Sequence, residues 1–394
     1  LSGNSTGYTG NISVGTLTTT AAGILKINTS ANALGATSGS TTINNGSALQ
    51  MEGGISYAAE PISIFGTGIN NDGAIRNLTG TNTITGAVTV SSNTRINADA
   101  GTLTFSNSNS ITLGTYSLIF GGNGNSTVSG ILASTPSSST ATLTKEGLGT
   151  LILDGENTYS GVTNITSGIV QVQKSNALGS LSGVGSSNTI VSNAAALQIV
   201  GGGLSIPEAI TINGTGIDNR GVIRNFTGST GVNVLSNTVT LNSASRINVD
   251  AGTLSMTAST ALATNTYPIN IGAAASTFIS VSGEITGSGS FTKDSTGTLF
   301  ISGNNANYTG AITVFKGVMN IQNSNALGTT DVATTVLTNA ALQVQGGLTI
   351  AEENINITGT GISSDGALRN ISGNNIFSGT LNLTGNSRVY IDAG

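Results

Sequence analysis

The feature that most constrains the fold of this chain is a long internal repeat. The stretch GTGINNDGAIRN at residues 66–77 returns as GTGIDNRGVIRN at 214–225 and as GTGISSDGALRN at 359–370. The copies are offset by 148 and 145 residues, and self-similarity at a nearly fixed period is typical of repeat architectures. The repeat divides the 394 residues into two whole units, 1–152 and 153–300, and part of a third, 301–394. We predict that they form one continuous rod within a longer chain.

A shorter period is nested within each long repeat. Alternating β-branched runs, such as ILKIN at 24–28 and PISIF at 61–65, are bounded by Gly, Asn or Ser about every 8 to 12 residues, which predicts short strands joined by tight turns. Recurring arginines keep a nearly constant interval, from Arg76 to Arg95 in the first unit and from Arg224 to Arg246 in the second. We take this interval as one coil, which gives about 20 residues per coil and about 20 coils.

These two periods together predict the fold class. An all-β, right-handed parallel β-helix (β-solenoid) built from tandem repeats of about 150 residues needs only short strands, with Gly and Asn at the corners. A pair of antiparallel Greek-key sandwiches is the alternative, but it does not explain the arginine interval.

The composition excludes several classes of function. Only 12 Lys and Arg stand against 17 Asp and Glu, so the net charge is −5 and we expect neither a nucleic-acid partner nor an anionic membrane surface. No run approaches the roughly 18 apolar residues that a bilayer span needs, so we expect no membrane insertion by this segment. Without His or Cys, the usual nucleophilic triads and zinc ligands are missing. We expect no cofactor; calcium held by scattered Asp and backbone carbonyls is the alternative.

One motif spans the boundary between the first two units. Residues 144–179 read TKEGLGTLILDGENTYSGVTNITSGIVQVQKSNALG, which resembles the passenger-associated strand repeat (autotransporter-associated β-strand repeat) of Gram-negative autotransporter and adhesin passengers. The third unit matches from Lys293 to Gly328, although 294–297 replace the first glycine pair and one residue is inserted before Tyr308. The first unit shows only the end of the pattern, to Gly35. The resemblance implies a secreted β-helical passenger at the bacterial cell surface.

Certain positions of this motif recur in each unit. An aromatic residue before Ser/Thr-Gly is more easily explained as a packed corner than as an exposed platform for sugars. The recurring motif positions are Tyr8, Tyr159, Gly161, Tyr308 and Gly310.

Recurring charges suggest a structural ladder. In each unit an Arg and an Asp four residues apart project from the same face of a strand, and a second Arg stands one coil earlier. We hypothesise that each Asp lies between two stacked arginines; an anion or glycan site is the functional alternative. The ladder residues are Arg76, Arg95, Asp99, Arg224, Arg246, Asp250, Arg369, Arg388 and Asp392.

These observations favour a non-enzymatic extracellular protein, a structural or adhesive rod or filament subunit of a bacterial surface. Expected partners are further copies, end to end or side by side, and a host surface or glycan. The alternative is a polysaccharide-binding or polysaccharide-cleaving β-helix enzyme that uses Asp154 with Glu156 or Glu352 with Glu353. A third possibility is that residues 144–179 assist export.

Overall fold

The computed structural model describes residues 1–16, 22–135, 141–180, 188–226 and 228–394. The chain is an all-β parallel β-solenoid of about 15 turns. Its helical content in the described ranges is three short 3-10 turns, and the strand registers given for those ranges are parallel, such as Ile12 with Thr41 and Ile223 with Ile247. The parallel pairing confirms the β-solenoid and contradicts the antiparallel sandwich.

The contacts divide the chain into two compact units. Unit 1 comprises Leu1–Val191 with Ala195–Leu197, and unit 2 comprises Ser192–Ala194 with Gln198–Gly394. This division follows spatial contacts, whereas the boundaries at 152/153 and 300/301 follow sequence repetition and stay predictions. Strand β21 (Ala195–Ile199) contains the division.

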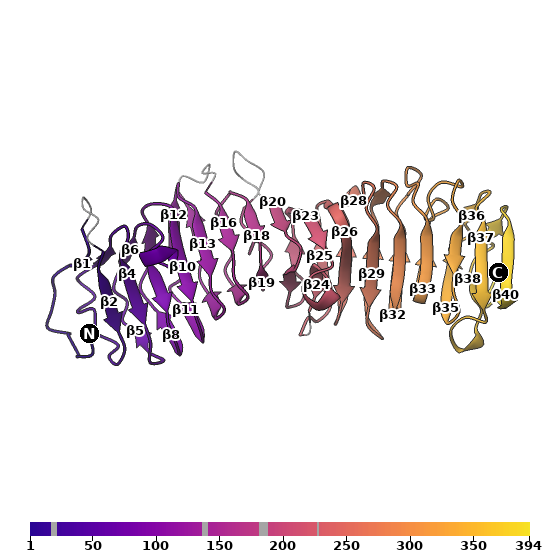
Figure 1. Ribbon diagram of the computed structural model, residues 1–394. Helices are drawn as coiled ribbons and strands as arrows, with labels where there is room; N and C mark the ends of the chain where they lie inside the picture. The colour runs from indigo at the N-terminus through magenta and orange to yellow at the C-terminus, as the bar shows by residue number, and fades with distance from the viewer. Residues whose placement is uncertain (17–21, 136–140, 181–187, 227) are drawn as a thin grey trace. The chain divides into compact units, whose positions relative to one another are not determined.

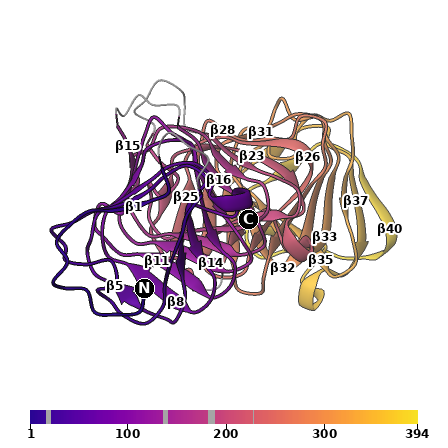
Figure 2. The same ribbon diagram turned by 60° about the vertical axis from the view of Figure 1, so that its left-hand side comes forward.

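The strands of unit 1 stack in three columns, and Figure 1 shows them lying side by side in chain order. Figure 2 brings the third column forward, with β5, β8, β11 and β14 on one face of the coil. The first column is β1 (Ile12–Val14), β3 (Thr41–Ile43), β6 (Ile62–Ile64), β9 (Val88–Val90), β12 (Ile111–Gly114) and β15 (Leu132–Ser134). The second is β2 (Ile24–Ile27), β4 (Ala48–Met51), β7 (Ile75–Asn77), β10 (Thr94–Ala98), β13 (Leu118–Gly121), β16 (Leu143–Lys145), β18 (Thr163–Ile165) and β20 (Asn188–Val191). The third is β5 (Ser56–Tyr57), β8 (Thr81–Ile84), β11 (Thr102–Phe105), β14 (Asn125–Val128), β17 (Thr150–Leu153) and β19 (Gly168–Val172).

Unit 2 is built in the same way, but three of its strands are long enough to run through a corner and serve two columns. These long strands are β26 (Val239–Val249), β32 (Phe291–Ile301) and β33 (Ile312–Ile321). With them, one column contains β24 (Ile223–Asn225), β29 (Ile269–Ala273), β34 (Thr334–Val336), β37 (Ile355–Gly359) and β40 (Leu381–Ser387). A second contains β22 (Ser205–Ile206), β25 (Val232–Leu235), β27 (Thr253–Met256), β30 (Phe278–Val281), β35 (Ala340–Gln345), β38 (Leu368–Ser372) and β41 (Val389–Ile391). The remaining strands are β23 (Ala209–Gly214), β28 (Thr260–Ala263), β31 (Glu284–Thr286), β36 (Thr349–Ile350) and β39 (Ile376–Phe377).

The length of a turn is not constant. The strand register places Thr150 opposite Ile169 but Ile12 opposite Thr41, so the second of these turns takes much more chain than the first. The expectation of about 20 residues in every coil is therefore wrong, and so is the expected number of about 20 coils. The turns differ because loops of different length join strands of similar length. There are consequently about 15 turns.

The core lies inside the coils. Strand residues alternate between the inside and the outside, as period-2 geometry requires, and the inward positions carry aliphatic or aromatic side chains. Phe105 of β11 and Phe120 of β13 are almost fully buried and meet edge to face, with ring centroids 6.1 Å apart. Burying each such side chain contributes about 1.5–3 kcal/mol, so the stacked inner faces are the main source of stability.

The three copies of the GTGI motif adopt the same turn. Each holds a 3-10 helix, and the glycine before it has φ between 77° and 81°, a left-handed conformation that glycine adopts without steric cost. At Gly216 a Cβ atom would also lie 2.2 Å from the carbonyl oxygen of Gly221. The 3-10 helices are η1 (Ile69–Asn71), η2 (Ile217–Asn219) and η3 (Ile362–Ser364).

We predict that Gly216→Ala destabilises unit 2 much more than Gly203→Ala. The two glycines have φ of 77° and 76°, but a Cβ atom at Gly203 would meet nothing within 4 Å. Gly203→Ala should therefore cost only the left-handed backbone term, about 1–2 kcal/mol, and Gly216→Ala that term plus a clash, more than about 3 kcal/mol in total. Urea unfolding followed by far-UV circular dichroism measures both. Equal losses would contradict the packing argument.

Candidate functional site

The ladder charges of unit 1 form a network across two coils. Arg76 points outward from β7, where its neighbours Ile75 and Asn77 point inward. Its Nε donates to Oδ2 of Asp99, which follows β10 on the next coil, at 2.7 Å, and its Nη1 donates to Asp72 at 2.9 Å. About a quarter of each of the Arg76 and Asp99 side chains is exposed, so the network is partly desolvated and stronger than a fully exposed pair.

The same arginine–aspartate pair recurs in unit 2. Arg224 Nε donates to Asp250 at 2.9 Å, and Arg369 Nε donates to Asp392 at 2.8 Å. The structure thus brings together the first arginine and the aspartate of each predicted ladder.

The second arginine of each ladder does not share that aspartate, which corrects the hypothesis of an Asp between two arginines. Arg95 pairs instead with Glu146 at 2.6 Å. The register explains this, because Arg76 lies opposite Asn97 and not opposite Arg95. The Nδ2 of Asn97 donates to Asp99 Oδ1 at 2.5 Å and so stands where the second arginine was expected.

In unit 2 the second arginines behave in a similar way. Arg246 pairs with Asp294 on a later coil. The guanidinium of Arg388 lies 4.8 Å from the ring centroid of Tyr390.

A glycine lies under the second arginine in both units. A Cβ atom at Gly121 would lie 2.1 Å from Nη2 of Arg95, and one at Gly272 would lie 2.6 Å from Nη2 of Arg246. A larger residue at either position would have to displace the guanidinium, so the space, and not the backbone conformation, favours glycine here. Sequence reasoning missed these glycines among the many that form turns.

Two buried lysines, Lys145 and Lys293, donate hydrogen bonds to the backbone of the corner beside the second arginine. Lys145 Nζ donates to the carbonyl oxygens of Glu146 at 2.7 Å and of Gly147 at 2.8 Å. Lys293 Nζ donates to the carbonyl oxygen of Lys316 at 3.1 Å. Burial lowers the pKa of both Lys145 and Lys293 to about 8, against the partial compensation of the adjacent carboxylates. Each lysine is the basic residue near the start of the motif that resembles the passenger-associated strand repeat. Its hydrogen bonds show that it satisfies backbone carbonyl acceptors.

The motif tyrosines are buried in two of the three sequence repeats. The Tyr308 hydroxyl donates to Gly289 O at 2.6 Å, and the Tyr159 hydroxyl lies 2.6 Å from Thr163 Oγ1. Burial raises the pKa of Tyr308. The packed corner expected for all three tyrosines is not found at Tyr8, which is 48 % exposed and donates to Asn11 O, three residues away.

The glycines that follow these tyrosines are buried as well. Gly161 and Gly310 both lie inside their corners. At Gly310 a Cβ atom would lie 2.4 Å from the Tyr308 hydroxyl. The Tyr-x-Gly spacing therefore serves close packing of the ring against the backbone.

An asparagine of the motif, which sequence reasoning did not single out, bridges three coils. Asn157 Oδ1 accepts from Leu132 N at 2.8 Å, and its Nδ2 donates to Ala177 O at 2.6 Å. Asn305 makes the corresponding pair of bonds to a preceding and a following coil. The sequence signal that could have identified these residues is the asparagine that both copies of the motif share.

Buried glutamates form a further repeating set that sequence reasoning missed. Glu60, Glu208 and Glu353 are 1–2 % exposed and keep the 148- and 145-residue offsets. Thr41 Oγ1 donates to Glu60 at 2.6 Å and Thr334 Oγ1 donates to Glu353 at 2.7 Å. The carboxylate oxygens of Glu208 have no hydrogen-bond partner among the described residues. Burial accordingly raises the pKa of Glu208 to about 7.

The carboxylates considered for catalysis differ in burial and in their contacts. Glu353 is buried whereas Glu352 is exposed. Asp154 lies 3.7 Å from Lys174, and Glu156 accepts from the backbone of Asn176 at 3.0 Å. Each of these contacts has a structural explanation.

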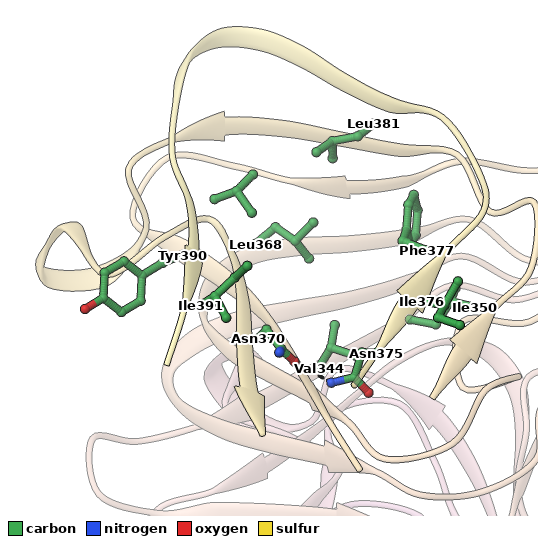
Figure 3. Close-up of a pocket in the computed structure, with 11 residues that line it drawn as sticks. Val344, Ile350, Leu368, Asn370, Asn375, Ile376, Phe377, Leu381, Tyr390 and Ile391 are labelled. Carbon is green, nitrogen blue, oxygen red and sulfur yellow. Dashed lines mark hydrogen bonds between the residues drawn. The ribbon is translucent and has the colours of Figure 1, made fainter. Parts of the chain in front are cut away.

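One apolar pocket of about 290 Å³ lies at the last coil of unit 2 (Figure 3). Leu368, Phe377 and Leu381 line it, while Tyr390 points away. Leu383 on the same strand is 61 % exposed, whereas its counterpart in the preceding repeat, Leu241, is fully buried. The pocket is therefore lined by apolar residues of the inner face of the coil.

Within the ranges described, no helix has the length and hydrophobicity needed to cross a bilayer. In the same ranges no three His, Cys, Asp or Glu side chains gather as possible metal ligands. The expectation of no cofactor, with calcium as the alternative, stays a prediction.

We predict that Lys145→Met destabilises the protein by at least about 2 kcal/mol, because it leaves buried carbonyl oxygens without a donor. The matched control is Lys174→Met, whose side chain is 47 % exposed and whose loss should cost less than about 0.5 kcal/mol. Thermal unfolding measures both variants. If Lys145→Met proves as stable as the parent, the lysine is merely tolerated in this corner.

Glu208 should make stability depend on pH between about 4.5 and 7. Its pKa is higher in the folded chain, so its protonation favours folding at low pH, and this advantage is lost as the pH rises through 7. The stability of Glu208→Gln relative to the parent should therefore increase from pH 4 to pH 8 by roughly 3 kcal/mol. Denaturant unfolding at the two pH values measures this difference. A constant difference for Glu208→Gln between the two pH values would refute the assignment.

Comparison with known proteins supports the resemblance seen in the sequence. A family model described as passenger-associated-transport-repeat matches residues 143–172 and 291–321. Comparison with curated proteins and with solved structures gives no match. The matched segments hold Lys145 and Lys293, so both copies include the buried lysine corner. The chain is therefore a parallel β-solenoid in which two segments match the passenger-associated-transport-repeat, and both features fit an autotransporter passenger.

Proposed function

We propose that this chain is a non-enzymatic structural or adhesive β-solenoid of a secreted bacterial surface protein. Its role would be to present an extended, weakly charged surface to further copies of itself or to a host surface or glycan.

The observation that carries the proposal is that charged side chains hold neighbouring coils together. Arg76, Arg224 and Arg369 each bind an aspartate of the next coil. Lys145 and Lys293 bind backbone carbonyls. A protein with few charges that commits them to holding coils together fits a structural part better than it fits a catalyst.

The arrangement of the acidic groups also supports this role. A glycoside-cleaving site needs two carboxyl groups about 5 to 10 Å apart on either side of a substrate. Asp154 and Glu156 are engaged with Lys174 and Asn176 on the adjoining turn. A repeated fold gains surface and length with every added coil.

The proposal is tested by displaying residues 1–394 on bacteria through an autotransporter barrel. Cells that carry the chain should attach to one another or to glycan-coated surfaces more strongly than cells that carry the barrel alone. The attachment should persist when the exposed candidates are changed together as Asp154→Asn, Glu156→Gln and Glu352→Gln.

The enzymatic alternative is measured on the purified chain. Our proposal expects no release of reducing ends from a panel of polysaccharides. Release that the triple variant abolishes would establish the enzyme instead, and the absence of any gain in attachment would refute the adhesive role.

A further inference from the structure

We propose that a groove on unit 2, beside Arg220, binds the carboxylate or sulfate group of an acidic sugar. The groove measures about 390 Å³, a size that suits a small ligand. This inference goes beyond the structural or adhesive role, since the site would bind its ligand whatever the rest of the chain does. Its lining is Asn219, Arg220, Arg224, Arg246, Asn248, Asp250, Ala274 and Ser295.

Two charges differ on this turn between the repeats: Arg220 replaces an aspartate, and Asp218, which does not line the groove, replaces Asn70. Arg220 is the counterpart of Asp72 in the first repeat and of Asp365 in the third. Each of these residues stands four positions before a ladder arginine. Both aspartates form an ion pair with the arginine four residues later, at 2.9 and 3.2 Å. In this one copy an arginine replaces the aspartate.

The backbone of the turn does not change with the charge. Gly68 and Gly216, which precede the two turns, have φ of 80° and 77°, and the central residues Asn70 and Asp218 have φ of 54° and 53°. The residue at position 220 therefore starts from the same place on the same turn as Asp72. The side chain, and not the fold, accounts for the difference.

The replacement leaves guanidinium donors without acceptors. Arg76 gives Nε to Asp99 and Nη1 to Asp72. Arg224 gives both Nε and Nη2 to Asp250. Among the described residues, Nη1 of Arg224 has no hydrogen-bond acceptor and Arg220 has no ion pair.

The local balance of charge is also inverted. In unit 1, two arginines of the network face three carboxylates, those of Asp72, Asp99 and Glu146. In unit 2, three arginines face only two carboxylates, those of Asp250 and Asp294. Counted over the groove lining alone, three arginines stand against the single carboxylate of Asp250, while Asp218 of the same turn lies outside the lining.

These features define the chemistry of the ligand. An anionic group placed where the Asp72 carboxylate stands in unit 1 would accept from Arg220 and from Nη1 of Arg224, and the planar guanidinium suits carboxylate and sulfate oxygens alike. The exposed Asn219 amide lies on the groove wall and could bond to hydroxyl groups. An acidic sugar combines an anionic group with hydroxyls.

Isothermal titration calorimetry at low ionic strength tests the site on the whole chain. The probes are an oligogalacturonate for carboxylates, a sulfated galactan oligosaccharide for sulfates and neutral dextran as the control. The parent should bind one or both acidic probes but not dextran, and binding should weaken with added salt because the site is open to solvent.

Arg220→Asp is the decisive variant, because it restores the residue found in the other two copies and should fold at least as well as the parent. It should lower the affinity for the acidic probe at least about tenfold, as expected when a charge-assisted hydrogen bond is replaced by repulsion. Lys174→Asp makes the same change of charge in unit 1 and should leave the affinity unchanged.

A second variant tests whether the same anion site can be created beside Arg76 in unit 1. Asp72→Arg should raise the stoichiometry by one acidic probe per chain. Failure of the parent to bind either acidic probe, or equal binding by the parent and Arg220→Asp, would overturn the proposal. These outcomes leave the attachment and reducing-end measurements unaffected, so the two proposals fail separately.

Discussion

In-register parallel stacking of the backbone is the constraint on which the other features of this structure depend. Each coil leaves its strand edges and its inner face unsatisfied until another coil covers them. The same position on successive coils is therefore held at the strand spacing, and the residue types that tolerate such stacking are selected. The column of Ile84, Phe105 and Val128 inside, and glycine beneath Arg95 and Arg246 outside, are both consequences of this close approach.

Polar side chains serve the same stacking. Asn157 and Asn305 each join three coils through backbone groups, and Lys145 saturates the carbonyls of its own corner. Arg76 reaches Asp99 because one turn separates them along the chain and a single strand spacing separates them in space. Buried donors and acceptors must be paired, so a chain with few charges places them where coils need to be held together.

This logic explains what could be predicted from the sequence. The alternation of β-branched residues and the repeated GTGI turn carry local information, so the parallel β-solenoid and the Arg–Asp pairs between coils were within reach. The partner of Arg95 was not, because Glu146 lies 51 residues away and the register depends on loop lengths that no local pattern encodes. Glu208 was missed for a different reason, since nothing in its neighbours distinguishes a buried glutamate from a solvated one.

The long repeat does not contain a whole number of turns. This determines on which face of the coil the equivalent residues of each repeat lie. Within unit 2, Arg224 lies in the column that contains β24, β29 and β34, whereas Arg369 lies in the column that contains β25, β30 and β35. Equivalent residues of successive repeats therefore occupy different columns of the coil. A substitution in one repeat, such as arginine for aspartate at position 220, changes one column locally and leaves the stacking of the others intact. The charge beside one turn can thus change in a single copy while the other two copies keep the ion pair between the aspartate and the arginine four residues later.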